Sequence, residues 1–302
     1  MPVVCILAGA VLWGTMGIFV RTLTAYGFND MQKIFYRGLF SAAIILIYLL
    51  IFDRSALKIR LRDIWCFIGT GIISFETFGF FYFYTINHAD MSVAAILLYT
   101  APTFVMCMSA IFFKEKFTLK KLAALLLTVV GCALVSGIAG AGLNLTALTL
   151  FTGIMSGLCY ALYSIFATVA LRRYSSMTVT FYTFVFSSIG TLPFINIPTT
   201  LTMVFTSGEA FVKMLLFAAV TSFFPYMLYT GGLKYTEAGK ASVCASLEPV
   251  VAAILGFFVF SEGMRADVFA GIALVVSAIV IMNIKKRGTG QDCKANKNQY
   301  IC

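Results

Sequence analysis

The two halves of this chain repeat each other, and this repeat constrains the fold more than any single motif. A shift of 147 positions places Pro102 on Pro249 and Glu115 on Glu262. An apolar chain made of two similar units is a common plan for membrane transporters, because two halves can move about a site between them. The aligned segments are 99–115 with 246–262 and 13–19 with 160–166.

The composition indicates a lipid environment. Of the 302 residues, 61% are hydrophobic and only 11% are charged, whereas ordinary soluble domains carry roughly 25% charged residues. A soluble protein of this length would need a polar surface that so few charges cannot provide. The first apolar run begins almost at Met1, without a basic stretch or a cleavage signature, so we expect an uncleaved first helix rather than a signal peptide.

Apolar runs of roughly 20 residues, broken at charges, prolines or Gly-Asn clusters, predict ten membrane spans. We therefore expect an all-α integral membrane protein with ten transmembrane helices. They would form two five-helix inverted-topology repeats, at 1–140 and 141–287, followed by a disordered cytoplasmic tail at 288–302. The expected spans are 3–20, 31–52, 64–86, 91–113, 122–138, 150–171, 177–197, 211–233, 241–260 and 268–284.

The basic residues predict the orientation of these spans. The net charge is +10, but Lys and Arg lie in short clusters between apolar runs, which is typical of cytoplasmic loops. Nucleic-acid binding would need a continuous basic face. With the N-terminus inside, 17 of the 22 Lys and Arg residues are cytoplasmic. We therefore expect a multi-pass protein of the cytoplasmic membrane with both termini in the cytosol.

An odd number of spans per repeat means that the second copy enters the membrane from the opposite side. The loop charges agree with this independently of the alignment. The loop after the second span is basic, whereas its counterpart at 198–210 has only Glu209 as a charged residue. Similar sequences with opposite loop charges indicate an inverted-topology repeat.

Residues that metal sites and soluble enzymes need are scarce. His88 is the only histidine, six of the eight cysteines lie in or beside apolar runs, and no cysteine pair has metal-ligand spacing. The chain also lacks a Walker-type glycine loop, HExxH and GxSxG. We expect no metal, no cofactor, no catalytic residue and no ATP-driven pumping by this chain alone.

In its order of motifs the chain resembles the drug/metabolite transporter superfamily, and specifically the EamA-type ten-helix exporters. The likeness extends over roughly residues 3–284. It implies a bundle with an alternating central cavity that moves small metabolites or amino acids, often outward. The residues that carry the likeness are Leu12-Trp13-Gly14, Arg37, Tyr99-Thr100-Ala101-Pro102, Glu115, Leu247-Glu248-Pro249, Glu262 and Gly271.

Charged residues inside the spans are candidates for function, because a charge at mid-bilayer costs at least about 2.5–3.5 kcal/mol. Glu76 lies halfway along the third expected span. It either binds a cation or a proton, or forms a structural contact with a neighbouring helix. Arg37 shares a helix face with Lys33. Arg37 either holds a substrate carboxylate, neutralises Glu76 or, like Lys33, extends to the membrane interface.

Prolines inside spans predict breaks that expose backbone groups to a cavity. Glu248 precedes Pro249 in the ninth span, and its repeat partner is Ala101. The resemblance includes the Glu-Pro pair, which favours a structural or gating role. The expected helix-break and gating residues are Pro102, Pro225, Glu248 and Pro249.

Aromatic side chains are abundant, with 30 Phe, 14 Tyr and 2 Trp. Some of them are expected to line an apolar path for aromatic or aliphatic solutes, although packing or lipid contact is the commoner role of a single ring. With the two charged candidates, the predicted substrate-binding and translocation residues are Trp13, Arg37, Glu76, Tyr82, Tyr99, Tyr160, Tyr163 and Tyr229.

These observations predict a secondary transporter that exports small organic metabolites, amino acids foremost, by alternating access through a central cavity. Its partners would be the small-molecule substrate, the lipid bilayer and, as a coupling ion, protons, and a homodimer is one possible assembly. The alternatives are an exporter of cationic drugs or a flippase for a lipid-linked substrate. A membrane enzyme is a further alternative, for which only the neighbourhood of Glu76 and Arg37 offers polar groups.

Overall fold

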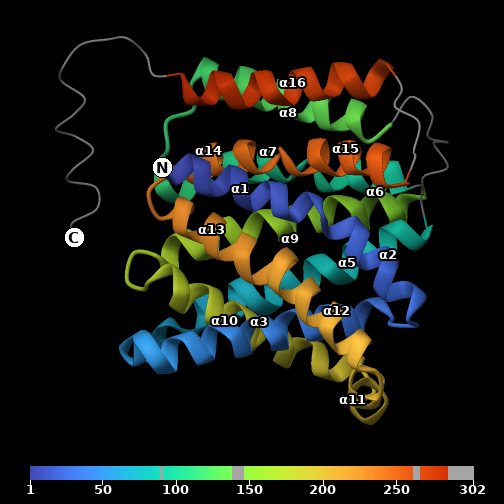
Figure 1. Cartoon of the computed structure of the whole chain (residues 1–302). Helices are drawn as coiled ribbons and strands as arrows, with labels where there is room; N and C mark the ends of the chain where they lie inside the picture. Colours follow the sequence, from blue (N-terminus) through green and yellow to red (C-terminus); the bar gives the residue numbers. More distant parts are fainter. Residues whose placement is uncertain (89–90, 138–145, 261–265, 285–302) are drawn as a thin grey trace.

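The computed structural model describes residues 1–88, 91–137, 146–260 and 266–284. All regular elements in these ranges are helices (Figure 1). Nine helical stretches in the described ranges are long and apolar enough to cross a membrane. The remaining expected span, 122–138, corresponds to α8, which has 17 residues and ends at Val135. The all-α, ten-helix prediction is thus confirmed, whereas the predicted tail and Glu262 lie outside the described residues.

The first five spans follow the predicted order (Figure 1). Short 3-10 turns, η1 and η2, precede the third span. The elements are α1 (Pro2–Gly14) with α2 (Met16–Ala25); α3 (Asp30–Phe52); η1 (Arg54–Leu57) and η2 (Leu61–Asp63); α4 (Ile64–Ile68), η3 (Gly69–Glu76) and α5 (Thr77–His88); α6 (Met91–Leu98) with α7 (Ala101–Phe113); and α8 (Leu119–Val135).

The second five spans add one short helix, α11, at the end of the bundle opposite the N-terminus (Figure 1). This helix is formed by residues that were predicted to be a loop between the seventh and eighth spans. The elements are α9 (Ala147–Ala170); α10 (Ser176–Thr191) with η5 (Leu192–Phe194); α11 (Ile197–Thr206); α12 (Gly208–Ala218), η6 (Ala219–Phe223) and α13 (Phe224–Leu233); α14 (Ala238–Ala245) with α15 (Glu248–Phe260); and α16 (Ala266–Asn283).

The irregular parts of the spans repeat at the same shift of 147 positions. The third span is wound as a π-helix at 69–76, and the eighth at 219–223, within the equivalent stretch. The fourth and ninth spans both break just before a proline, so that α7 begins at Ala101 and α15 at Glu248. Pro102 and Pro249 occupy the first helical turn, where the missing N–H is not needed. Pro225 is the second residue of α13, the helix that directly follows η6.

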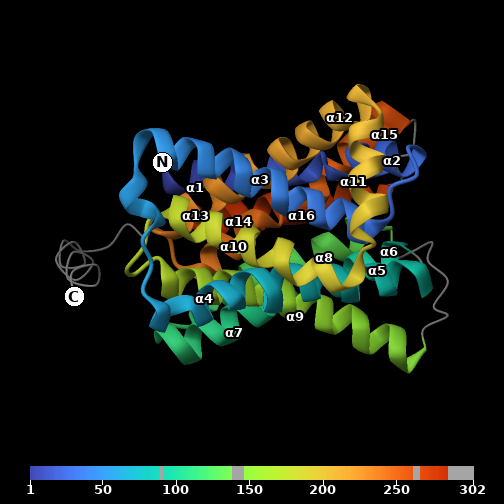
Figure 2. The ribbon, with the colours of Figure 1, turned by 90° about the horizontal axis from the view of Figure 1, so that it is seen from below.

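The two halves are interleaved. In Figures 1 and 2, α1 of the first half lies against α13 and α14 of the second, while α9 of the second half lies against α5. Likewise α3 packs on α10. Only α8 and α16 stand apart as a pair at one edge of the bundle (Figure 1). A space at the centre is therefore bounded by helices of both halves.

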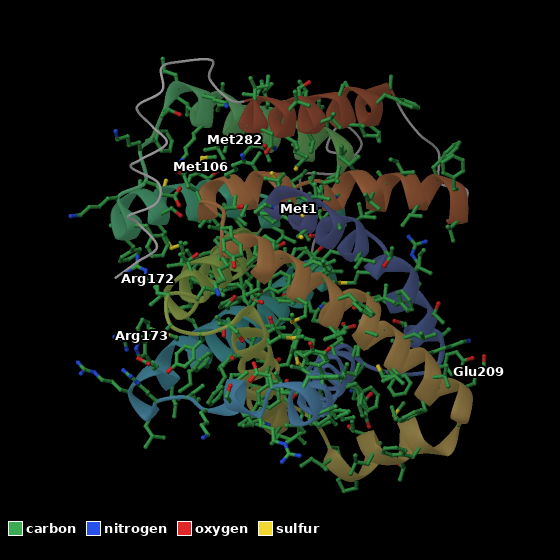
Figure 3. The ribbon with its side chains drawn as sticks, turned by 60° about the vertical axis from the view of Figure 1, so that its left-hand side comes forward. Met1, Met106, Arg172, Arg173, Glu209 and Met282 are labelled. Atoms are coloured by element: carbon green, nitrogen blue, oxygen red, sulfur yellow. The ribbon has the colours of Figure 1, made fainter. Side chains whose placement is uncertain are left out.

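Ion pairs join the two halves at one end of the bundle. Arg173 Nη1 lies 3.0 Å from Asp63 Oδ1. Lys121 Nζ lies 3.0 Å from Glu115 Oε2 and 2.8 Å from Glu237 Oε2. Glu115 also accepts a hydrogen bond from the first backbone N–H of α14. Figure 3 shows Arg172 and Arg173 at this end and Glu209 at the opposite end.

Candidate functional site

A narrow, aromatic-lined cavity lies between α1, η3, α5, α9 and α13. Both halves of the chain contribute to it. Aromatic rings make up most of its wall, and two serines add hydroxyl groups. Its lining residues are Trp13, Ser74, Phe75, Phe78, Tyr160, Tyr163, Ser164, Tyr226 and Tyr229.

Helical spacing directs these side chains into one cavity. On α9, Tyr160, Tyr163 and Ser164 are three and four residues apart and therefore share a face. The second-half rings are fixed by hydrogen bonds between α9 and α13. Tyr163 Oη shares one of 2.7 Å with Thr230 Oγ1, and Ser164 Oγ shares one of 2.7 Å with Tyr229 Oη. The wall is thus pre-oriented rather than formed by freely rotating rings.

Tyr226 stands at the centre of this wall, although it was not among the predicted site residues. Its ring centre lies 5.1 Å from that of Trp13, 5.0 Å from Tyr163 and 5.5 Å from Phe75. These are normal distances for edge-to-face aromatic pairs. Its position three residues before Tyr229, on the same helix face, was the sequence signal that could have found it.

A second narrow cavity lies between the breaks of the fourth and ninth spans. Tyr160 lines both cavities, which are therefore neighbours. The predicted gating residues Pro102 and Glu248 both lie in this wall. Its lining residues are Tyr99, Ala101, Pro102, Tyr160, Ser242, Ala245, Ser246 and Glu248.

Glu248 is the one carboxylate in the two cavity walls. Its Oε2 accepts a long hydrogen bond of 3.5 Å from Tyr160 Oη. Tyr99 lines the same cavity as Glu248. The ring of Tyr82 stacks on Phe78, which lines the aromatic cavity. Two predicted tyrosines, Tyr99 and Tyr160, thus share a cavity wall with a residue predicted for gating.

Arg37 is 7% exposed and lies behind the aromatic cavity. Its Nε donates to Ser222 Oγ at 2.7 Å, and its Nη2 donates to the Thr221 carbonyl oxygen at 3.3 Å. The guanidinium also lies 5.1 Å from the ring centre of Phe75. Within the described residues no ion pair joins Arg37 to a carboxylate, so it does not neutralise Glu76 in this structure.

Glu76 is 5% exposed and faces α10 instead of the cavities. Its Oε2 accepts a hydrogen bond of 2.8 Å from Thr191 Oγ1. The cavity walls contain its neighbours Ser74, Phe75 and Phe78 but not Glu76 itself. The structure therefore separates this carboxyl group from the cluster of predicted aromatic residues.

The comparison with known proteins assigns the family. Residues 1–137 and 147–284 each match the EamA-like transporter family. The chain is an EamA-like transporter. This family is part of the drug/metabolite transporter superfamily, so the resemblance expected from the sequence is confirmed. The family points to membrane transport rather than enzyme chemistry.

Relatives of this EamA-like chain extend over nearly its full length. An uncharacterized transporter of Archaeoglobus fulgidus is 27% identical over 285 residues, which are 91% of this chain and 94% of the relative. The uncharacterized inner membrane transporter YicL of Salmonella typhimurium is 22% identical over 287 residues, 93% of this chain and 95% of YicL. A crystal structure with 15% sequence identity has a TM-score of 0.76 and matches 93% of this chain and 96% of its own. The last match supports the fold alone.

Within the EamA fold, the two cavities bring together most of the predicted site. Trp13, Tyr160, Tyr163 and Tyr229 line the first cavity, and Tyr99 lines the second with Pro102 and Glu248. Arg37 touches the cavity wall from behind, and Pro225 precedes Tyr226 on α13. Besides Tyr226, the residues that sequence reasoning missed are Ser74, Phe75, Phe78, Ser164, Ser242 and Ser246.

Proposed function

We propose that this protein is a secondary carrier that exports small organic solutes, amino acids or related compounds, by alternating access. The observation that carries this proposal is the aromatic cavity bounded by both halves, to which the first half contributes Trp13 and Phe75 and the second half Tyr163 and Tyr229. A relative movement of two halves changes access to a cavity that lies between them. The moving units in this proposal are the repeats at 1–140 and 141–287.

The breaks in the fourth and ninth spans support a gating role in this mechanism. Each break interrupts the helix for two residues next to the second cavity, at 99–100 and 246–247. A helix tolerates such a break inside a membrane where its backbone groups face protein or a polar cavity. The helices resume after the breaks at Ala101-Pro102 and at Glu248-Pro249. After η6, α13 likewise has a proline, Pro225, as its second residue.

For coupling, we propose a proton bound by Glu76. This carboxyl group is buried at mid-span, where it accepts a hydrogen bond from Thr191 Oγ1. Within the described part of the chain it forms no ion pair with Lys or Arg. Burial disfavours the ionised form of a carboxyl group that has no cation beside it, so the protonated form is the more stable of the two.

Counterflow uptake into proteoliposomes, with a mixed pool of amino acids and related metabolites at two internal pH values, tests the carrier proposal. We expect saturable uptake of one compound class and a dependence on the pH gradient that Glu76→Gln removes. Unchanged pH dependence in Glu76→Gln would exclude Glu76 as the proton site. No uptake by folded, inserted protein would reject this substrate class and favour the cationic-drug, lipid-linked or enzyme alternatives.

We also propose that the end of the bundle with Arg172 and Arg173 faces the cytosol, because cytoplasmic loops are rich in Lys and Arg. Lys58 lies in the basic loop before the third span, and Thr199 lies on α11; both residues are exposed. In a cysteine-free background, a membrane-impermeant maleimide should label Thr199→Cys in intact cells and Lys58→Cys only after permeabilisation. The reverse pattern would invert the proposed orientation.

A further inference from the structure

The second cavity contains an unusual combination for an apolar bundle, a carboxylate between aromatic rings. Glu248 is the first residue of α15 and has Tyr99 and Tyr160 in the same wall. The helix ends around it carry opposite partial charges, because α14 ends and α15 begins at this point. These opposed dipoles largely cancel, so the carboxylate decides the sign of the local field.

Glu248 has capacity for a further partner. Among the described residues it accepts one hydrogen bond, the 3.5 Å contact with Tyr160 Oη, whereas an ionised carboxylate can accept several. In the described ranges no Lys or Arg forms an ion pair with it. The guanidinium of buried Arg37 is held by Ser222 and Thr221.

The chemistry of this wall selects among possible ligands. An anionic group would be repelled by ionised Glu248, and a neutral group would add no charge that stabilises the ionised form. A cationic group would stabilise that form, which burial alone disfavours. A metal ion would need several ligands, and no group of three His, Cys, Asp or Glu residues occurs in the described part of the chain. An organic ammonium ion supplies positive charge and hydrogen-bond donors to a carboxylate, and its cation is attracted to the faces of tyrosine rings.

We propose that the second cavity binds the ammonium group of a protonated organic amine, with Glu248 as its counter-ion and Tyr99 and Tyr160 as its aromatic walls. The adjoining aromatic cavity takes the apolar part of the same solute, because Tyr160 belongs to both cavities. This site rests on the proposed function, since it defines the substrate class of that carrier. Glu248 is then a binding residue as well as the start of α15.

Tryptophan fluorescence can measure this binding directly. Trp13 lines the aromatic cavity, whereas Trp65, the second of the two tryptophans, is exposed on the outside of the bundle. In a Trp65→Phe background, phenethylamine, phenethyl alcohol and phenylacetate are titrated against purified protein. These probes share one ring and differ in charge. We expect phenethylamine to bind at least about tenfold more tightly than the alcohol, and phenylacetate to bind most weakly.

Two matched variants decide whether Glu248 causes this preference. Glu248→Gln should abolish the preference for the amine and leave binding of the alcohol within about twofold, because only the charge pair is lost. Glu76→Gln, the same change at a carboxyl group that lines neither cavity, should keep the preference. Retention of the amine preference in Glu248→Gln would overturn the proposal.

A second measurement uses the protein without changes at Glu248. Dicyclohexylcarbodiimide modifies carboxyl groups in apolar surroundings, and mass spectrometry locates the product. Phenethylamine should protect Glu248 but not Glu76, and phenethyl alcohol should protect neither. Equal modification of Glu248 with and without the amine would overturn the site even if Glu248→Gln failed to fold.

Counterflow separates this proposal from the carrier function. Uptake of solutes without any dependence on their positive charge would reject the ammonium site and leave the carrier intact. Binding of phenethylamine at Glu248 without counterflow of any solute would support the site and reject the carrier. Amine counterflow that Glu248→Gln abolishes would support both.

Discussion

Exchanging Arg37 for methionine is expected to lower solute counterflow by about tenfold or more, which corresponds to at least about 1.4 kcal/mol in the transport barrier. Arg37 links α3 to the π-helical segment of the eighth span through Ser222 and Thr221. It also lies against Phe75, which belongs to the wall of the aromatic cavity. Methionine keeps an apolar contact but loses both hydrogen bonds, so the cavity wall and η6 are no longer held together.

The same substitution should change the thermal unfolding midpoint only slightly. Unpaired Ser222 and Thr221 groups each cost about 1–3 kcal/mol when buried. In the opposite direction, the change removes a buried charge that has no carboxylate partner among the described residues, and this relieves its desolvation cost. Thermal unfolding in detergent and counterflow in proteoliposomes together measure the two effects.

Lys33→Met is the matched control, since Lys33 lies one turn earlier on α3 and is 3% exposed. Its Nζ lies 2.8 Å from Asp30 Oδ1 and donates to Thr24 Oγ1 at 2.7 Å, and it does not line either cavity. We expect counterflow to be retained in this variant. Equal losses in Lys33→Met and Arg37→Met would mean that any buried cation on α3 has the same effect, which contradicts a specific role for Arg37.

Exchanging Gly157 for leucine is expected to destabilise the folded protein by about 1–3 kcal/mol and to abolish transport. A Cβ atom at this position would lie 2.6 Å from Thr100 Oγ1 and 2.9 Å from the Leu97 carbonyl oxygen. Thr100 lies in the break between α6 and α7, and Leu97 lies in the last turn of α6. The Leu97 carbonyl is backbone, which cannot move away without moving the end of α6. The thermal unfolding midpoint should fall and counterflow should be lost.

Gly231→Leu is the control for the substitution itself. Gly231 lies inside α13, and no atom lies within 4 Å of the position of its absent Cβ atom. Leucine has a higher helix propensity than glycine, so this variant should unfold at the same temperature or slightly above it. A loss at Gly231 as large as at Gly157 would contradict the argument from close packing.

The structure gives a physical reason for the Leu12-Trp13-Gly14 motif. A Cβ atom at Gly14 would lie 2.6 Å from Val251 Cβ and 3.0 Å from the Glu248 carbonyl oxygen. Gly14 therefore lets α1 approach the break of the ninth span, much as Gly157 lets α9 approach the break of the fourth. Close helix packing through small residues is common in membranes, and here it positions Trp13 in the cavity wall.

The sequence by itself determined the membrane spans, their order and the places where they break. These features depend on local properties, namely the length of apolar runs and the positions of Pro102, Pro249 and Pro225. The same shift that aligned the prolines also aligned the two π-helical segments. The aromatic residues of α9 were predictable for a similar reason, because three- and four-residue spacing fixes a common face in a regular helix.

Only the tertiary structure decided which face of each helix meets the cavity. Glu76 accepts a hydrogen bond from Thr191 on α10, whereas Tyr226 lies at the centre of the aromatic wall. Glu76 ends a π-helical segment, whose different winding shifts the faces that α-helical periodicity would assign. Arg37 likewise donates a hydrogen bond to Ser222, which lies 185 positions away in the sequence, and not to Glu76. Partners so distant in sequence depend on how the helices rotate and pack together, which local periodicity does not encode.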